Sequence, residues 1–258
     1  MNSIRLDNIE PLPTEINNLK ELLVDCYRLA FEIPKKIDVY NENPLQIISS
    51  CLFIKVINAT RAILVLFENN LLSEVHVLLR HEMEAIFVLK ACYEDKQFLK
   101  EYINSDILYR LKMGNVISQN QNNFKENEEF DIERIKSLKS DLKLIVDENG
   151  IKEVKIESLA KKAKMESYYD TAYRFLSNIV HIGIKSLDDY LKVDEKRKVR
   201  ELLIYPYQKE IPTLFITAIE LILIALDCIN IIFKIGNEET ILSLKKRLNE
   251  LAKSYLPR

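Results

Sequence analysis

The residues best suited to chemistry in this sequence lie in one segment, from Tyr173 to His181. Arg174 and His181 are seven residues apart, nearly two helical turns, so on a helix both side chains leave the same face. Tyr173, Ser177 and His181 form a second row at spacings of four, with Asn178 beside them. An aligned histidine, arginine and hydroxyl are a possible phosphate-handling site, because imidazole exchanges protons near neutral pH and guanidinium binds phosphate oxygens. They are equally a possible buried polar contact without chemistry, and the sequence leaves both interpretations open.

Two other apolar segments carry polar residues at helical spacing. His76, Arg80 and Glu84 follow one another at spacings of four, and the apolar residues around them predict that Arg80 and Glu84 lie partly inside as a pair. Glu220 and Asp227 are seven residues apart and therefore share a face. Three helices that each hide polar residues could present them to one pocket, or use them only to fix helix register. The ligand-binding or supporting residues that we predict are Arg80, Glu84, Tyr173 and Glu220.

Most cofactor-dependent and metal-dependent chemistries lack their usual motif here. No G-x-x-x-x-G-K-[ST], G-x-G-x-x-G or G-x-S-x-G pattern occurs, and the four glycines are scattered. His81-Glu82 begins like H-E-x-x-H, but the second histidine is missing. We therefore expect no cofactor and no metal; few enzyme classes remain, and the sequence favours metal-free acid–base chemistry among them.

The composition predicts an all-α protein. The chain has 258 residues, 48% of them hydrophobic, with only four glycines and seven prolines, and so few breakers favour long helices. We expect a single domain over residues 1–258, a bundle of about seven to nine helices. The net charge of −2 gives no global attraction to nucleic acid, although a local patch remains possible. The cysteines are predicted to be buried free thiols in a reducing cytoplasm, and the polar N-terminus lacks a signal region; they are Cys26, Cys51, Cys92 and Cys228.

Periodicity and capping residues place the helices along the chain. Two long apolar segments joined by Asn69-Asn70 predict a central antiparallel hairpin. The polar segment 119–129 is expected to be a loop, and 192–212 a connection that is part helix and part extended. Segment 211–235 is long enough to span a membrane, but Glu220 and Asp227 inside it favour a bundle helix and no membrane contact. The predicted helices are 14–32, 43–69, 71–95, 96–118, 131–150, 156–164, 167–191, 213–234 and a last one capped by Asn237.

Short motifs in two regions resemble a bacterial family known as domain-of-unknown-function family 5677. The first is Leu71-Leu72-Ser73-Glu74 followed by Leu78-Leu79-Arg80 and Glu84; the second is the row Tyr173, Leu176, Ser177 and His181. The resemblance covers roughly residues 50 to 235 and implies an all-helical fold. It brings no established activity.

Arg174 and His181 also resemble the R-x(4–6)-H pattern of HEPN-type (higher eukaryotes and prokaryotes nucleotide-binding) helical domains. Many of those domains are metal-independent ribonucleases of toxin and antiviral systems that act as dimers. The resemblance implies that Arg174 and His181 are the catalytic pair and Asn178 an accessory polar group. The residue after the arginine is usually polar in those domains, and here it is Phe175.

The function that we expect is a cytoplasmic HEPN-like ribonuclease or nucleotide-binding protein in a toxin or phage-defence setting. RNA or a nucleotide would be its partner, and a homo-oligomer is expected because the apolar helices exceed what one bundle face needs. The catalytic candidates are Arg174, Ser177, Asn178 and His181. One alternative is a non-enzymatic helical interaction protein in which the polar cluster is structural. Another is a small-ligand sensor without turnover.

Overall fold

The structure, a computed structural model, describes residues 12–120, 132–181 and 184–255. It is all-α, as the sequence predicts, except for one small strand pair in the described residues. The elements are α1 (Asn17–Glu32), α2 (Pro44–Glu68), α3 (Leu72–Glu94), α4 (Lys96–Gln119), α5 (Ile132–Asn149), α6 (Ile156–Lys162), α7 (Glu166–Tyr168), a π-helical turn (Tyr169–Tyr173), α8 (Arg174–Val180), α9 (Ile184–Leu187), β1 (Leu191–Val193), β2 (Val199–Leu202), α10 (Ile211–Phe233) and α11 (Glu238–Tyr255).

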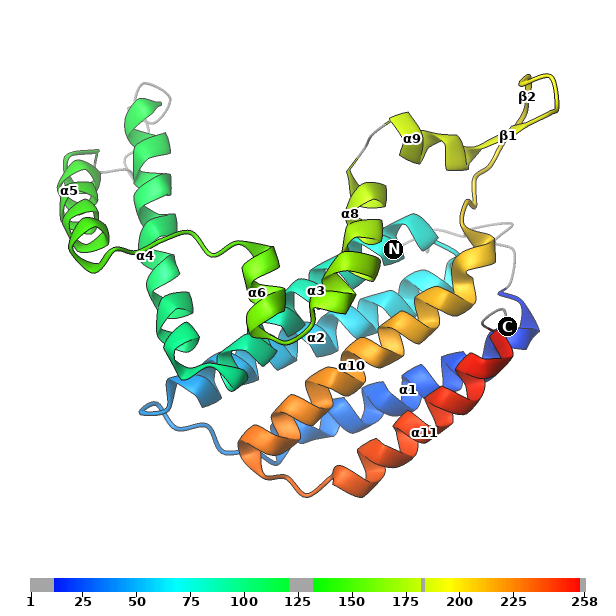
Figure 1. The fold of residues 1–258 in the computed structure, drawn as a ribbon, viewed down its shortest axis with the longest axis horizontal. Helices are drawn as coiled ribbons and strands as arrows, with labels where there is room; N and C mark the ends of the chain where they lie inside the picture. Colours follow the sequence, from blue (N-terminus) through cyan, green and yellow to red (C-terminus); the bar gives the residue numbers. More distant parts are fainter. Residues whose placement is uncertain (1–11, 121–131, 182–183, 256–258) are drawn as a thin grey trace, which may run out of the picture.

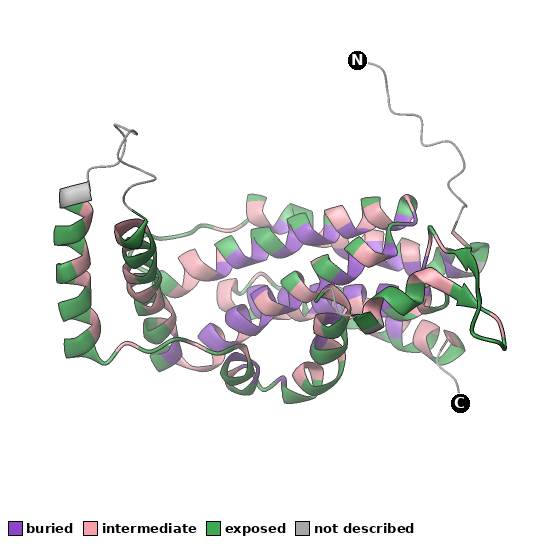
Figure 2. Cartoon of the chain, turned by 90° about the horizontal axis from the view of Figure 1, so that it is seen from above, coloured by how far each residue is buried: buried purple, intermediate pink, exposed green. Residues whose placement is uncertain are grey.

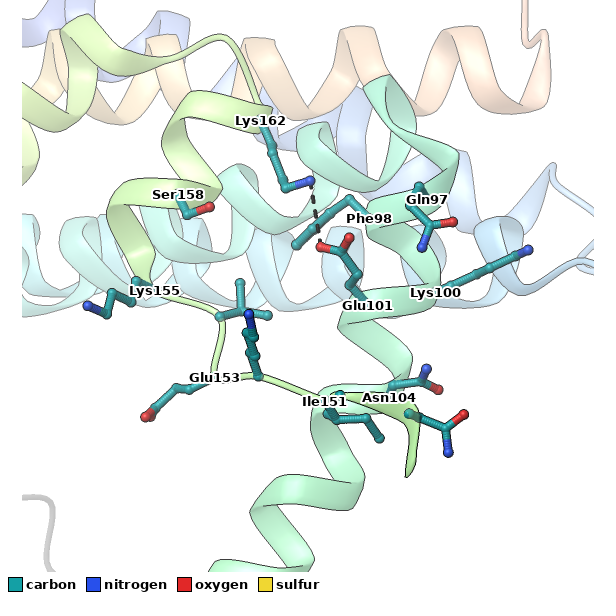
Figure 3. Close-up of a pocket in the computed structure, with 14 residues that line it drawn as sticks. Gln97, Phe98, Lys100, Glu101, Asn104, Ile151, Glu153, Lys155, Ser158 and Lys162 are labelled. Atoms are coloured by element: carbon teal, nitrogen blue, oxygen red, sulfur yellow. Dashed lines mark ion pairs between the residues drawn. The ribbon is translucent and has the colours of Figure 1, made fainter. Parts of the chain in front are cut away.

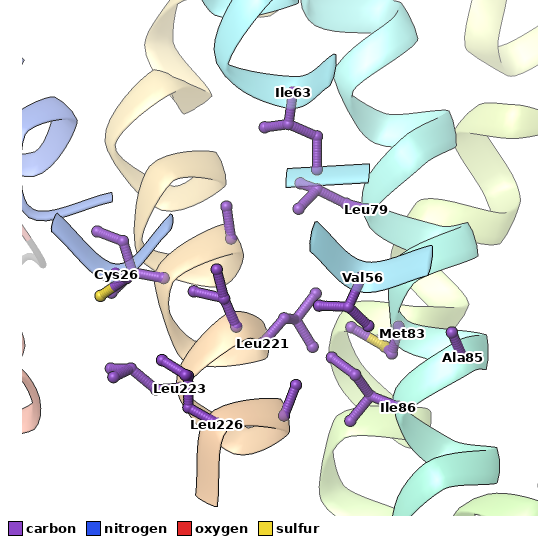
Figure 4. Packing of buried hydrophobic residues seen from close by; sticks show 14 of the residues in the cluster. Cys26, Val56, Ile63, Leu79, Met83, Ala85, Ile86, Leu221, Leu223 and Leu226 are labelled. Atoms are coloured by element: carbon purple, nitrogen blue, oxygen red, sulfur yellow. The ribbon is translucent and has the colours of Figure 1, made fainter. Parts of the chain in front are cut away.

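The core lies between α1, α2, α3, α10 and α11, which run alongside one another in Figure 1. Helix α10 is apolar on almost every side because it packs against α1, α2, α3 and α11. Figure 4 shows aliphatic side chains from these helices meeting between them. Phe67 of α2 stacks on Phe215 of α10 with ring centroids 3.8 Å apart. Such close packing removes the apolar faces from water and supplies most of the stability of the bundle.

Helices α2 and α3 form the predicted central antiparallel hairpin. The Asn43 side chain accepts a hydrogen bond from the Gln46 amide, and Pro44 occupies the first turn of α2. The turn between the helices places Asn70 at φ 54°, a left-handed conformation that asparagine tolerates. This hairpin fixes the position of α3, whose polar residues contact the segment that leads into α8.

Two described helices, α2 and α10, are long and apolar enough to cross a membrane by length and composition alone. In the structure 67% of the most apolar stretch of α10 is buried inside the protein, compared with 44% for α2. Burial in the bundle accounts for the apolar character of α10, because a helix surrounded by other helices is hydrophobic on all sides.

Helices α4 and α5 form an arm that extends from the core (Figure 1). Figure 2 shows this arm as mostly exposed or half-buried, and Phe98 at its base is the buried residue of α4. Asp95 caps α4 by accepting hydrogen bonds from the amides of Gln97 and Phe98. Gly150 follows α5 with φ at 59°, the left-handed conformation in which a glycine commonly ends a helix. Residues 121–131, which include most of the expected loop and the first residue of the predicted helix 131–150, lie outside the described residues.

Two sequence-based expectations were wrong in detail, and a third was right only in outline. The predicted helix 167–191 ends early: α8 ends at Val180, because the backbone of His181 turns to an extended conformation with ψ at 115°. The connection 192–212 is part extended and part helical, as expected, but its extended part belongs to an antiparallel hairpin of β1 and β2 that the sequence did not predict. The strands of this hairpin are almost wholly exposed and therefore lack the alternating pattern of a half-buried strand. Cys51 is exposed on α2, whereas burial raises the pKa of each of the other three thiols to about 12.

Candidate functional site

The candidate site lies where the π-helical turn and α8 pack against α3 (Figure 1). The turn over Tyr169–Tyr173 has wider hydrogen-bond spacing than an α-helix, and such turns are often found at functional sites. Tyr173 is buried at the end of this turn, and its ring stacks on that of Tyr169 with centroids 5.3 Å apart. The same ring lies 5.9 Å from Phe87 of α3. The turn therefore anchors the start of α8 in the core.

The Tyr173 hydroxyl joins Arg80 and Glu84 of α3 in a closed network. It accepts a hydrogen bond from Arg80 Nη2 at 3.1 Å and donates one to Glu84 Oε1 at 2.8 Å. Arg80 Nη2 is also 3.2 Å from Glu84 Oε1, which is the predicted pair one turn apart. Burial raises the pKa of Tyr173, although the Arg80 hydrogen bond opposes this, and the phenol stays protonated as a donor. These three predicted supporting residues thus come together and hold α8 on α3.

Arg174 and His181 lie on the outer face of α8. The Arg174 side chain is 60% exposed, lies 3.5 Å from Asp170 Oδ1 and covers the Tyr169 ring at 5.3 Å. The His181 amide donates to the Ser177 carbonyl at 3.1 Å, so its Cα still follows the helical path although the helix ends there. Seven residues along that path place His181 within about 20° of Arg174 around the helix axis. Both groups therefore face solvent on one side of α8.

The predicted row of Tyr173, Ser177 and His181 divides along the helix. Tyr173 is buried, Ser177 is half-buried and His181 is exposed, so the first residue belongs to the core and the last to the surface. Asn178 is exposed next to Arg174. Within the described part of the chain the His181 ring makes no hydrogen bond or ion pair, which leaves its nitrogens accessible to a ligand.

Glu220 and Asp227 do not join a common pocket with these residues. Glu220 accepts a hydrogen bond from Tyr168, and burial raises the pKa of its carboxyl. Asp227 instead pairs with Lys245 of α11. Of the two alternatives that the sequence left open, the polar residues of the three helices do not form one pocket. They form separate clusters, which include the Tyr173 network with α3 and the contact of Glu220 with Tyr168.

A second polar contact, which the sequence did not identify as a site, lies one turn before Arg80, nearer the start of α3. His76 is fully buried; its Nδ1 lies 2.7 Å from the Leu72 carbonyl and its Nε2 lies 3.2 Å from Glu210 Oε2. Because Leu72 offers only an acceptor, Nδ1 carries a proton, and the contact with Glu210 needs another proton between imidazole and carboxyl. The Tyr207 ring packs on His76 at 4.7 Å. His76 belonged to the recognised row of α3, but Glu210 lies 134 residues away and no periodicity relates the two.

The described residues form several cavities of ligand size. A groove of about 450 Å³ separates the π-helical turn and α8 from the start of α10, and Phe175 and Glu210 line it. A larger cavity of about 610 Å³ lies at the base of the arm, and neither α8 nor the Tyr173 network lines it. Figure 3 shows Lys162 inside this larger cavity, paired with Glu101. Among the described residues no three histidine, cysteine or acidic side chains gather closely enough to hold a metal ion.

Comparison with known proteins places the chain among relatives of unknown function. A search of curated proteins and a search of solved structures each gave no match. The sequence profile described as "Family of unknown function (DUF5677)" matches residues 46–198, which include the Tyr173 network and both Arg174 and His181. Because the match covers more than half of the chain, the protein belongs to this family of unknown function, DUF5677.

Proposed function

We propose that this protein is an HEPN-like, metal-independent ribonuclease or nucleotide-binding protein that works through the exposed face of α8. The observation that carries the proposal is the shared exposure of Arg174 and His181 on one side of the helix, separate from the network that holds the helix in place. A phosphate can approach that face without displacing any buried group. The cytoplasmic location, the homo-oligomer and the toxin or defence setting belong to the same proposal.

The proposed chemistry is attack of the RNA 2′-hydroxyl on the neighbouring phosphorus. The imidazole of His181 takes the proton of the attacking hydroxyl or gives a proton to the leaving 5′-oxygen as the P–O5′ bond breaks. Arg174 binds the phosphate oxygens, on which negative charge grows in the transition state. Ser177 and Asn178 supply further hydrogen bonds to the phosphate or sugar.

Arg174 must leave Asp170 to reach a phosphate near His181. The Arg174–Asp170 contact is long, at 3.5 Å, and both side chains are about 60% exposed. Exposed ion pairs of this kind contribute at most about 1 kcal/mol, and a phosphate offers a stronger charge-assisted hydrogen bond. The contact therefore holds the guanidinium near the site without blocking it.

The test is degradation of RNA in the presence of a metal chelator. His181→Ala is expected to lower the rate by about 10²–10⁴-fold, the contribution typical of a general acid or base. His81→Ala is the matched control, because His81 is another exposed histidine but lies on α3; its activity should equal that of the wild type. Equal activity of the His181→Ala variant would remove the proposed mechanism.

One observation favours the non-enzymatic alternative. Arg80, Glu84 and Tyr173 bond to one another without a ligand, although the buried Arg80 Nε has no partner among the described residues. A scaffold or a small-ligand sensor would then degrade no RNA. Thermal-shift measurements with nucleotides separate these two, because stabilisation by a ligand indicates a sensor and its absence a scaffold.

A further inference from the structure

The groove between α8 and α10 has the size and lining of a small-molecule site. Its volume of about 450 Å³ lies within the range of about 300–1,000 Å³ that is usual for such sites. Phe175 and Leu176 form the wall on α8, and Leu214 forms the facing wall on α10. Phe175 is 50% exposed, which is unusual for a phenylalanine and leaves its ring available to a ligand.

The polar groups of this groove offer hydrogen-bond acceptors. Thr171 Oγ1 donates its proton to the Ser167 carbonyl at 2.6 Å, and Thr217 Oγ1 donates its proton to the Thr213 carbonyl at 2.8 Å. Each of these two hydroxyls uses its one proton, so it offers a ligand only oxygen lone pairs, whereas the hydroxyl of Thr213, which also lines the groove, can donate or accept. Glu210 adds a carboxyl to the groove, and no lysine or arginine is among the described residues that line it.

Glu210 is held so that one carboxyl oxygen is left for a ligand. Its Oε2 contacts the buried His76 Nε2 at 3.2 Å, while the side chain as a whole is 36% exposed. When His76 carries the shared proton, Glu210 is an anion that lines the groove. The balancing positive charge is then on the buried His76 imidazolium, which does not line the groove. Since Coulomb energy falls with distance, a charged group in the groove interacts more strongly with the carboxylate than with the imidazolium.

We propose that this groove binds a small molecule that has an apolar body and a primary ammonium group. The body lies between Phe175 and Leu214, and the ammonium group donates to Glu210 and to the threonine oxygens. An anionic ligand is disfavoured, because the described residues that line the groove include no cation and the Glu210 carboxylate repels a second negative charge. The site lies beside the exposed face of Arg174 and His181 and does not depend on the function proposed for that face.

The test compares three probes that differ only in their polar end, each titrated calorimetrically into the full chain. They are 4-phenylbutylamine, 4-phenylbutan-1-ol and 4-phenylbutyrate. The amine should bind at least about tenfold more tightly than the alcohol, which corresponds to about 1.4 kcal/mol, and the carboxylate should not bind measurably. Equal binding of amine and alcohol would show an apolar groove without the proposed specificity and would overturn the inference.

Two variants assign the preference to particular atoms. Glu210→Gln should abolish the tenfold preference, and its amide can still donate a hydrogen bond to neutral His76, so the fold should persist. Glu195→Gln is the matched control, because it removes an exposed carboxylate outside the groove and should leave the preference unchanged. Thr217→Val removes one acceptor at nearly constant volume and should weaken the amine several-fold while sparing the alcohol. A preference that survives both Glu210→Gln and Thr217→Val contradicts the assignment.

Discussion

The inner and outer sides of the site helix differ in how their polar groups are held. On the inner side Tyr173 bridges Arg80 and Glu84, which lie on another helix about 90 residues away in sequence. On the outer side Arg174 pairs with Asp170 and covers the ring of Tyr169, both in its own helical segment, and His181 is exposed. The two sides do not differ in residue type, since each has an ionisable group and an aromatic or hydroxyl group. They differ in how far away in the sequence the interaction partners lie. Contacts with distant residues indicate a structural role, whereas contacts within the same helical segment leave a side chain available to bind a ligand.

The largest effect on protein stability is expected at Glu82, a buried carboxyl on the side of α3 that faces α2. Burial raises the pKa of its carboxyl from about 4.5 to about 8, although a hydrogen bond with Thr60 opposes this shift. Glu82 Oε2 has no partner among the described residues, and Thr60 Oγ1 lies 2.9 Å from Oε1 and 3.0 Å from the Val56 carbonyl. A protonated Glu82 can donate to Thr60, which then donates to Val56. The folded protein therefore holds Glu82 neutral.

We expect Glu82→Gln to abolish a pH dependence of stability. Between pH 4.5 and 8 the unfolded chain loses the Glu82 proton while the folded protein keeps it, so the wild type is most stable at the acid end and loses stability as the pH rises. At one pKa unit per 1.36 kcal/mol, the total loss is on the order of 3–5 kcal/mol by pH 8. Urea denaturation at several pH values measures it. Glu74→Gln, an exposed position on the same helix, should keep the wild-type pH profile; a pH profile in Glu82→Gln identical to that of the wild type would show that Glu82 is ionised in the fold.

A smaller effect is expected on the inner side, at Tyr173. Tyr173→Phe keeps the ring packing but removes the hydroxyl that bridges Arg80 and Glu84. Loss of hydrogen bonds to charged partners that are partly exposed should lower the free energy of unfolding by about 1–3 kcal/mol. Tyr109→Phe on the exposed arm is the control and should change it by less than about 0.5 kcal/mol.

A double-mutant cycle tests whether the inner network acts as a unit. Adding Glu84→Gln to Tyr173→Phe should cost less than the sum of the two single changes, because both remove the same hydrogen bond. Strict additivity would mean that Tyr173 and Glu84 contribute independently, and the inner side would then resemble the outer one.

The regular part of this fold could be predicted because its signals are local. The apolar periodicity of α2 and α3, and the cap formed by Asn43 and Pro44, each lie within a few residues of the element that they define. The Arg80–Glu84 pair was predictable for the same reason, since the two residues are one turn apart on α3. The contact of this pair with Tyr173 was predicted only as a possible shared pocket, because residue spacing within a helix does not determine the angle at which two helices pack.

The parts that could not be predicted depend on distant partners or on exposed backbone. His76 meets Glu210, and Glu220 meets Tyr168, only after the chain has folded. The end of α8 at Val180 was not predicted, because apolar residues recur beyond it at the same helical spacing as within the helix. The β1–β2 hairpin was missed because exposed strands carry no buried face to leave a pattern of period two.

The smallest effect on stability is expected on the outer side, at Arg174. Arg174→Ala removes an exposed contact of 3.5 Å with Asp170 and a ring contact with Tyr169, so the free energy of unfolding should change by less than about 0.5 kcal/mol. The same variant should lose RNA cleavage at least about tenfold, because the guanidinium binds the phosphate in the proposed mechanism. Urea denaturation and RNA-cleavage assays on the same preparation of the variant test both expectations. A variant that unfolds much more easily and cleaves RNA normally would reverse the contrast between the two sides, since Arg174 would then be structural like Tyr173.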